Sequence, residues 1–162
     1  MIHDKLLIIV FCLVCINGAP IVARHLFKTR FNYPIDFHHH AWDGNRLLGD
    51  SKTIRGLLFA CLAGLILSPL IGVDWSIGFI FGLMAMFGDI LASFTKRRFG
   101  LHSGESVLGL DQLPEAFLPL LIIRPILDMS WLQIIIIALA FLVAELYISP
   151  ILYRLKIRRR PR

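Results

Sequence analysis

Apolar residues gather into long runs that are separated by short polar segments. A helix needs roughly 20 apolar residues to cross a hydrocarbon core about 30 Å thick. A shorter run, residues 116–129, contains Pro119, Arg124 and Pro125. Four longer runs are plain candidates for crossing: residues 6–23, 57–73, 75–92 and 131–148. The pattern predicts an all-α, polytopic membrane protein.

The basic residues indicate that the shorter run also crosses. Lys and Arg concentrate in the cytoplasmic loops of membrane proteins. If residues 116–129 cross, segments 24–55, 96–98 and 154–162 share one face and hold 15 of the 17 Lys and Arg residues. We therefore predict about five transmembrane helices, with the N-terminus outside and with two polar loops and a basic tail in the cytoplasm. Trp75 and Trp131 would lie at outer span ends, where amphipathic rings prefer to sit.

The first apolar run has a second interpretation. Lys5 precedes an apolar stretch ending in small residues, which is also the pattern of a secretory signal peptide. Pro20, directly after Ala19, argues against cleavage. Loss of this run would leave four spans and would not change the orientation of the others.

Composition agrees with a membrane domain. The 162 residues are 57% hydrophobic and only 17% charged, with a mean hydropathy of +0.73. The net charge of +6 would suit a nucleic-acid-binding protein, but such domains lack repeated apolar runs of helix length, so we expect no nucleic-acid partner. Cys12, Cys15 and Cys61 lie in apolar runs and are predicted to pack as small hydrophobic residues. We expect a single membrane-embedded domain over residues 1–162.

Polar residues recur at helical spacing near the inner end of the third run. Asp89, Ser93, Lys96 and Arg97 follow one another at intervals of four, three and one, so one helix face presents a carboxylate, a hydroxyl and two cations. An ionisable residue inside a span is costly, which makes Asp89 a functional candidate. The alternative is that Asp89 pairs with a cation and holds helices together.

A second carboxylate returns to the same membrane depth. A loop with Gly100, Gly104 and Gly109 leads to Asp111 and Gln112 at the start of the next apolar run. Two carboxylates together with phosphate oxygens suit Mg²⁺, which takes few protein ligands. The alternative for Asp111 is a helix cap.

The first cytoplasmic loop offers cations and hydroxyls directly before the second span, which should begin near Thr53 or Ile54. A helix N-terminus binds phosphate through free N–H groups. Lys52, Thr53 and Arg55 are therefore candidates for holding a polyphosphate. His38, His39 and His40 are consecutive and lack further ligands, so we leave them out of the site.

Several motifs together resemble the CDP-archaeol synthase family, which is similar to the phosphatidate cytidylyltransferases. These motifs are Asn17-Gly18-Ala19-Pro20, Asp43-Gly44, Gly49-x-Ser51-Lys52-Thr53-x-Arg55-Gly56, Gly88-Asp89-x-x-x-Ser93-Phe94-x-Lys96-Arg97-Arg98 and Leu110-Asp111-Gln112. The resemblance implies a membrane enzyme that uses CTP and Mg²⁺ to convert a lipid phosphate in the inner leaflet into a CDP-activated lipid, releasing pyrophosphate.

Residue roles follow from this resemblance by position. It implies that Asp89 and Asp111 are metal-site carboxylates and that Lys96 and Arg97 take part in catalysis. The implied nucleotide and phosphate contacts are Asp43, Lys52, Thr53, Arg55, Ser93, Arg98 and Gln112. The family pattern commonly places an Asp after Leu113, whereas Pro114 and Glu115 follow here. This departure indicates a divergent branch, with Glu115 as a possible substitute.

The proposed chemistry needs no general base. A phosphomonoester has a second pKa of about 6 and is largely ionised at neutral pH, so the lack of a Ser-His-Asp or Cys-His set does not argue against an enzyme. Two alternatives stay open: a small transporter or channel lined by Asp89 and Arg124, and a non-catalytic protein that binds acidic lipids. Pro119 and Pro125 also suggest a lateral lipid opening walled by Phe117, Leu120 and Leu121.

Overall fold

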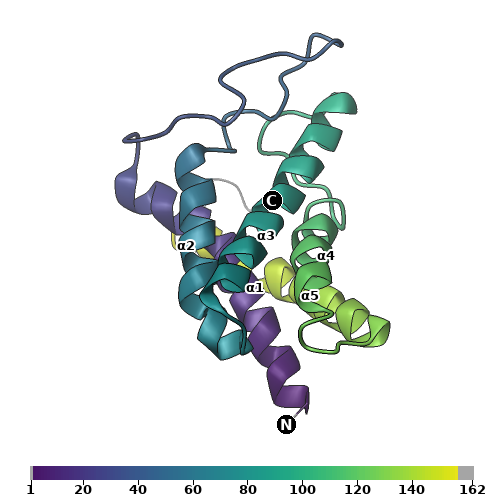
Figure 1. The fold of residues 1–162 in the computed structure, drawn as a ribbon. Helices are drawn as coiled ribbons and strands as arrows, with labels where there is room; N and C mark the ends of the chain where they lie inside the picture. The colour runs from purple at the N-terminus through teal and green to yellow at the C-terminus, as the bar shows by residue number, and fades with distance from the viewer. Residues whose placement is uncertain (1, 157–162) are drawn as a thin grey trace.

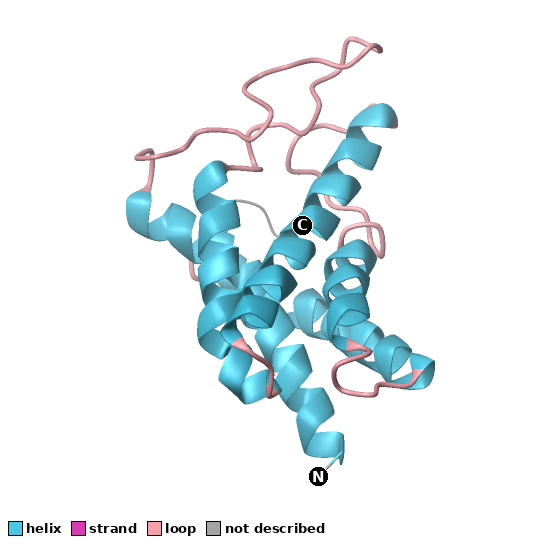
Figure 2. Ribbon diagram, in the orientation of Figure 1, coloured by secondary structure: helices cyan, strands magenta, loops and turns pink. Residues whose placement is uncertain are grey.

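The computed structural model describes residues 2–156 and is helical, with long loops at one end (Figure 1). Within this range Figure 2 shows helices joined by loops and turns. Two isolated bridges join Pro34 with Thr53 and His40 with Arg46. The helices are α1 (Ile2–Phe27), α2 (Ile54–Ile71), α3 (Trp75–Arg98), α4 (Gln112–Ile123) and α5 (Trp131–Arg154). The all-α prediction is confirmed.

Four of these helices, α1, α2, α3 and α5, are long and apolar enough to cross a membrane. The fifth, α4, has 12 residues and lies earlier than the predicted run at 116–129. It includes Pro119 but ends at Ile123, and turns follow through Asp128. Pro125 lacks the N–H that would continue the helical ladder, which explains this early end. The chain is thus a multi-pass integral membrane protein, and its orientation stays a prediction.

Both long loops, 28–53 and 99–111, lie at the end of the bundle away from the start of α1 (Figure 1). We call this end the loop end. The basic segments 24–55 and 96–98 lie there too, as the charge pattern predicted. The predicted basic tail, 154–162, lies outside the described residues beyond Lys156.

The core is formed by apolar side chains from all five helices. Leu13, Phe81, Leu120, Ile134 and Phe141 are fully buried within it. Cys12 and Cys61 are buried as predicted, and Cys15 is half-buried. Other apolar side chains on the outer helix faces are exposed, as expected of surfaces that meet lipid: Leu7, Phe11, Leu62, Ile66, Ile135 and Leu139.

Glycines bring the central helices unusually close. A methyl group on Gly64 of α2 would lie 2.2 Å from the carbonyl oxygen of Gly78 on α3. A methyl group on Gly88 of α3 would lie 2.3 Å from the carbonyl oxygen of Pro114 on α4. Small residues allow such backbone approach between membrane helices. The second contact sets Asp89 against Glu115, one residue further along each helix.

Candidate active site

A polar cavity of about 470 Å³ lies at the loop end of the bundle. All five helices, or the loops next to them, contribute to its wall. All but two of the predicted site residues line it: Lys52, Thr53, Arg55, Asp89, Ser93, Lys96, Arg97, Asp111 and Gln112. The prediction that Asp89, Ser93, Lys96 and Arg97 share a helix face is confirmed, because all four face this cavity. Asp89 and Asp111 therefore lie in one site.

Asp89 lies between a cation and a second carboxyl group. Lys52, from the loop before α2, forms an ion pair with it. The Glu115 carboxyl group of α4 lies close to Asp89 and interacts with it electrostatically. Both members of the ion pair are mostly buried, with side-chain exposures of 14% and 17%. Two adjacent carboxyl groups can both be ionised only if a cation lies nearby, and Lys52 supplies one such positive charge here.

Asp111 is held by a different cation. The Lys96 ammonium lies 2.5 Å from Asp111 Oδ1 and donates to the carbonyl oxygen of Glu105 at 2.8 Å. The other carboxylate oxygen of Asp111 accepts from the Val107 N–H. Asp111 stands at the N-cap position of α4, but its side chain makes no capping hydrogen bond. The structure thus does not favour the capping alternative, and Lys96 instead fastens the 99–111 loop to α3.

Two buried arginines combine structural hydrogen bonds with an unpaired donor. Arg97 donates to the carbonyl oxygen of Leu101. Arg55 donates to the carbonyl oxygens of Lys28 and Arg30 and to the side chain of Asn32. In each arginine the Nε is buried and has no hydrogen-bond partner. An unpaired buried donor is costly, and an anion in the cavity is a suitable acceptor.

Thr53 has a definite local role. Helix α2 begins at Ile54, as expected, and the Thr53 hydroxyl oxygen accepts from the Gly56 N–H at 3.1 Å. This cap fixes the start of α2 beside the cavity. Its neighbour Lys52 is thereby placed to reach Asp89.

Asp43 and Arg98 lie outside the cavity. Arg98 Nη1 is 3.1 Å from Asp43 Oδ1, and Nη2 donates to the carbonyl oxygen of Arg46 at 2.8 Å. The guanidinium also stacks over the rings of Trp42 and Phe94. This position does not support the predicted nucleotide contacts of these two residues. The pair instead pins the first loop to the end of α3, and the nucleotide contacts of these two motif residues stay a prediction.

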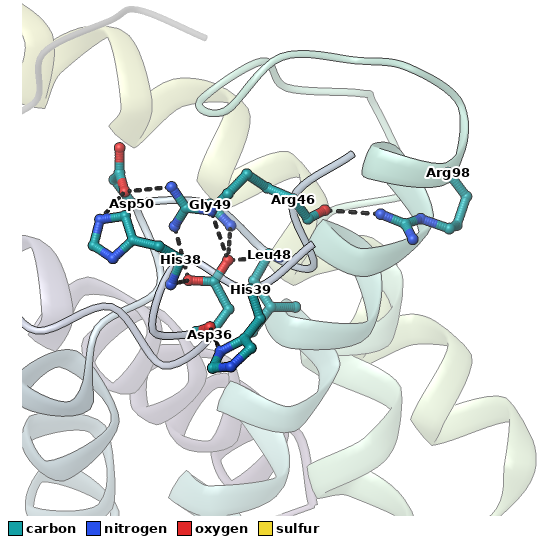
Figure 3. A network of polar contacts seen from close by, with 8 residues as sticks. All are labelled: Asp36, His38, His39, Arg46, Leu48, Gly49, Asp50 and Arg98. Atoms are coloured by element: carbon teal, nitrogen blue, oxygen red, sulfur yellow. Dashed lines mark hydrogen bonds and ion pairs between the residues drawn. The ribbon is translucent and has the colours of Figure 1, made fainter. Parts of the chain in front are cut away.

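Asp36 organises the first loop, and the sequence analysis did not identify it (Figure 3). Its carboxylate accepts from Arg46 Nη2 at 2.8 Å and Nε at 3.1 Å. It also accepts from the backbone N–H groups of Leu48 and Gly49 at 3.1 and 2.9 Å. Burial alone would raise the pKa of Asp36, but these hydrogen bonds outweigh it and hold the pKa well below its usual range.

This folding of the loop positions Lys52. The Ile35 N–H donates to the carbonyl oxygen of Lys52 at 2.8 Å, so the residue next to Asp36 holds the backbone of Lys52. His38 lies 3.7 Å from Asp50 in the same network (Figure 3), and His39 Nδ1 is 2.9 Å from the carbonyl oxygen of Asp36. The histidines accordingly belong to the loop network.

Glu145 is a site residue that the sequence analysis missed. It comes from α5, lines the cavity and acts electrostatically on Glu115. The signal was present, because Glu145 is an ionisable residue within an apolar span, the criterion already applied to Asp89. Asn17 and Arg24 of α1, and Lys28 directly after it, line the cavity as well.

The carboxyl groups of the cavity are better suited to Mg²⁺ than to a metal ion that takes all of its ligands from the protein. Among the described residues, no group of three or more His, Cys, Asp or Glu side chains is placed to hold a metal ion. Mg²⁺ commonly uses one or two carboxylates and completes its shell with water and substrate phosphates. Asp89 and Asp111 are each engaged by a lysine, Lys52 and Lys96 respectively, and Asp89 also lies beside Glu115. The contact between Asp89 and Glu115 is the arrangement that suits such an ion.

The chain is similar over most of its length to archaeal lipid enzymes. A family model described as CarS-like CDP-archaeol synthase matches residues 70–161. A CDP-archaeol synthase from Sulfurisphaera tokodaii is 42% identical over 158 residues, covering 92% of this chain and 89% of the relative. A second, from Sulfolobus acidocaldarius, is 37% identical over 134 residues, covering 79% and 82%.

A solved structure of an archaeal enzyme has a similar fold. It is described as an intramembrane enzyme for archaeal membrane lipid biosynthesis and superposes with a TM-score of 0.70 at 28% identity. The match covers 88% of this chain and 90% of the solved chain. Together with the motifs that line the cavity, these similarities show that the chain belongs to the CarS-like CDP-archaeol synthase family.

Proposed function

We propose that this protein transfers the cytidylyl group of CTP to a lipid phosphate, forming a CDP-activated lipid and pyrophosphate with the aid of Mg²⁺ at the cytoplasmic face. Membership of the CDP-archaeol synthase family supports this reaction class. The observation that carries the proposal is a cavity in which cations and carboxyl groups from separate helices meet. The lipid acceptor that the relatives' name suggests is the archaeal ether lipid.

The reaction joins two anions. An oxygen of the lipid phosphate attacks the α-phosphorus of CTP, and the bond from that phosphorus to the oxygen bridging to the β-phosphate breaks. The electron pair leaves with pyrophosphate, and no proton has to be removed because the attacking oxygen is already ionised. The barrier is therefore mainly the repulsion between phosphates, and catalysis consists of positioning and charge stabilisation.

The cations of the cavity are suited to this task. We assign Lys96 and Arg97 to the phosphates of CTP, because both are buried on the face of α3 that lines the cavity. Lys52 and Arg55 lie across the cavity at the start of α2. Ser93, Thr53 and Gln112 add hydroxyl and amide groups to the wall. These fixed charges lie in a partly buried site, where their effect exceeds that in water.

The carboxyl groups have two roles in this proposal. Asp89 and Glu115 would hold Mg²⁺, which would neutralise charge on the phosphates when bound. Asp111 orients Lys96 through the 2.5 Å ion pair. The proposal thus shifts the second metal-site carboxylate from Asp111 to Glu115, on the evidence of the contact between Glu115 and Asp89.

The location of the cavity suits the two substrates. Basic segments gather at the loop end, which the distribution of Lys and Arg predicts to be cytoplasmic. CTP is soluble and would approach from the cytosol. A lipid phosphate would lie in the adjacent leaflet, so a cavity at this depth would reach both.

A transfer assay with radiolabelled CTP tests the proposal. Purified protein in detergent would receive Mg²⁺ and a phytanyl-chain dialkylglycerol phosphate, and labelled CDP-lipid would be counted after extraction. We expect product from the wild type and a fall of at least about 100-fold in kcat for Asp89→Asn, the usual scale for loss of a charge-positioning group. Asp111→Asn should also lose activity.

Thermal unfolding of each variant separates a loss of chemistry from a loss of fold. Substitution of Leu62, an exposed apolar residue of α2, by Ala is the matched control and should keep activity. Absence of CDP-lipid from the wild type with every lipid phosphate tried would refute the proposed reaction. Full activity in Asp89→Asn would refute the assigned site.

A further inference from the structure

The carboxylate of Asp36 is buried within the first loop, although it does not line the polar cavity. Two nitrogens of Arg46 donate to it (Figure 3). The backbone N–H groups of His38, Leu48 and Gly49 donate to it as well. Loss of any of these hydrogen bonds would leave a polar group with a reduced set of partners at a mostly buried position, which is costly. Asp36 therefore holds this part of the loop in one arrangement.

The backbone of Lys52 is held on both sides by neighbours of this carboxylate. The Lys52 N–H donates to the carbonyl oxygen of Gly49 at 3.3 Å, and Gly49 itself donates to Asp36. The Lys52 carbonyl oxygen accepts from the N–H of Ile35, the residue before Asp36. Gly49 has a φ of +101°, which favours glycine, and a methyl group there would lie 2.7 Å from Ser103 Oγ. The turn is thus packed against the other long loop and has little room to shift.

Lys52 carries this arrangement into the cavity. Its ammonium forms an ion pair with Asp89, and its side chain is 14% exposed. A lysine side chain is a flexible four-carbon stem, so the position of its backbone decides where the ammonium can reach. Resting on the proposed function, we propose that Asp36 is a positioning residue of the transfer reaction, which sustains the rate by holding Lys52 against Asp89.

Replacement of Asp36 by Asn tests this role. The amide keeps the size of the side chain but loses the charge and one acceptor oxygen, so the turn before Lys52 should loosen. A misplacement of about 1 Å can cost roughly 100-fold in rate, and we expect kcat to fall at least about tenfold. His38→Asn is the matched control in the same loop, because its side chain is exposed and Asn tolerates the positive φ of this residue. It should keep the kcat of the wild type.

A double-mutant cycle distinguishes positioning from a general structural role. If Asp36 acts through Lys52, the two changes are not additive, and Asp36→Asn should lower kcat by less than about twofold in a protein that already carries Lys52→Met. A further tenfold loss in that background would overturn the proposal. Arg46→Lys keeps the charge but loses the two-nitrogen contact, so the same cycle can be run with this milder change if Asp36→Asn does not fold.

Acetylation of lysines tests the arrangement without relying on activity. The protein in detergent would be treated with acetic anhydride, and the modification rate of each lysine would be measured by mass spectrometry. Lys96 is the internal reference, because its ion pair with Asp111 lies outside the first loop. We expect Asp36→Asn to raise the labelling rate of Lys52 at least about fivefold by local opening, with a change of less than about twofold at Lys96. An unchanged rate at Lys52, or an equal rise at both lysines, would overturn the proposal.

Failure of the positioning role and failure of the proposed function give different results. If the wild type forms no CDP-lipid, the proposed function fails, whatever the labelling shows. If the wild type is active but neither kcat nor the labelling of Lys52 responds to Asp36→Asn, only the positioning role is refuted.

Discussion

The close contact between α3 and α4 at Gly88 should control activity. In Gly88→Ala the new methyl group would lie 2.3 Å from the carbonyl oxygen of Pro114 and 2.6 Å from the backbone nitrogen of Glu115. Ordinary contact begins near 3.4 Å, so one helix must move by roughly 1 Å. Both obstructing atoms are backbone, which means that no side chain can swing away to relieve the clash.

That displacement separates Asp89 from Glu115. A misplacement of about 1 Å can cost roughly 100-fold in rate, and overpacking typically costs about 1–3 kcal/mol of stability. We therefore expect Gly88→Ala to unfold at a lower temperature, yet to remain folded at the assay temperature with kcat reduced about 100-fold. The assay is CDP-lipid formation from radiolabelled CTP, with the folded fraction measured by thermal unfolding in the same detergent.

Gly18→Ala is the matched control, because nothing lies within 4 Å of a methyl group placed on this helical glycine of α1. It should keep both the activity and the unfolding temperature of the wild type. Wild-type kcat in Gly88→Ala would refute the reasoning, since the helices would then tolerate separation without loss of chemistry. An equal loss in Gly18→Ala would point to a general effect of alanine in these helices.

Three further predictions concern the other charged groups. Lys96→Met and Asp111→Asn should each lower the free energy of unfolding by about 3 kcal/mol, because each leaves a mostly buried charged partner unpaired. The double variant removes both charges and should recover part of that loss, as measured by thermal unfolding. Glu115→Gln should raise the Mg²⁺ concentration for half-maximal activity at least about tenfold, and an unchanged requirement would remove Glu115 from the metal site. Asp36 has a depressed pKa in the folded protein, so its contribution to stability is present above its unfolded pKa of about 4 and is lost as pH falls through its folded pKa. Unfolding between about pH 4 and pH 2 should accordingly depend less on pH in Asp36→Asn than in the wild type, and parallel profiles would contradict this.

Sequence patterns predicted the helices well because bilayer thickness and hydropathy determine them locally. The start of α2 near Thr53 followed from a capping residue, and the shared face of Asp89, Ser93, Lys96 and Arg97 followed from the helical repeat. The shorter fourth helix was placed too late along the chain, because its polar first turn, Gln112 to Glu115, was not counted as helix.

Contacts between elements were predicted less well. Nothing local to Asp43 or Arg98 shows that they pair with each other outside the cavity. Arg55 was assigned to phosphate, yet most of its donors hold the turn after α1. Asp36 lies in a loop without helical or strand periodicity, so its role as the centre of the loop depended on a fold that no repeat reveals.

The sequence by itself determined that the chain crosses a membrane, that its basic residues concentrate in three polar segments and that its motifs resemble the CDP-archaeol synthase family. These are properties of composition and spacing, which persist whatever the helices pack against. Tertiary structure alone decided that Glu115 lies beside Asp89, that Asp111 holds Lys96 and that Arg98 pairs with Asp43 outside the cavity. Such pairings depend on how closely helix backbones approach, and side chains distant in sequence meet there only after packing.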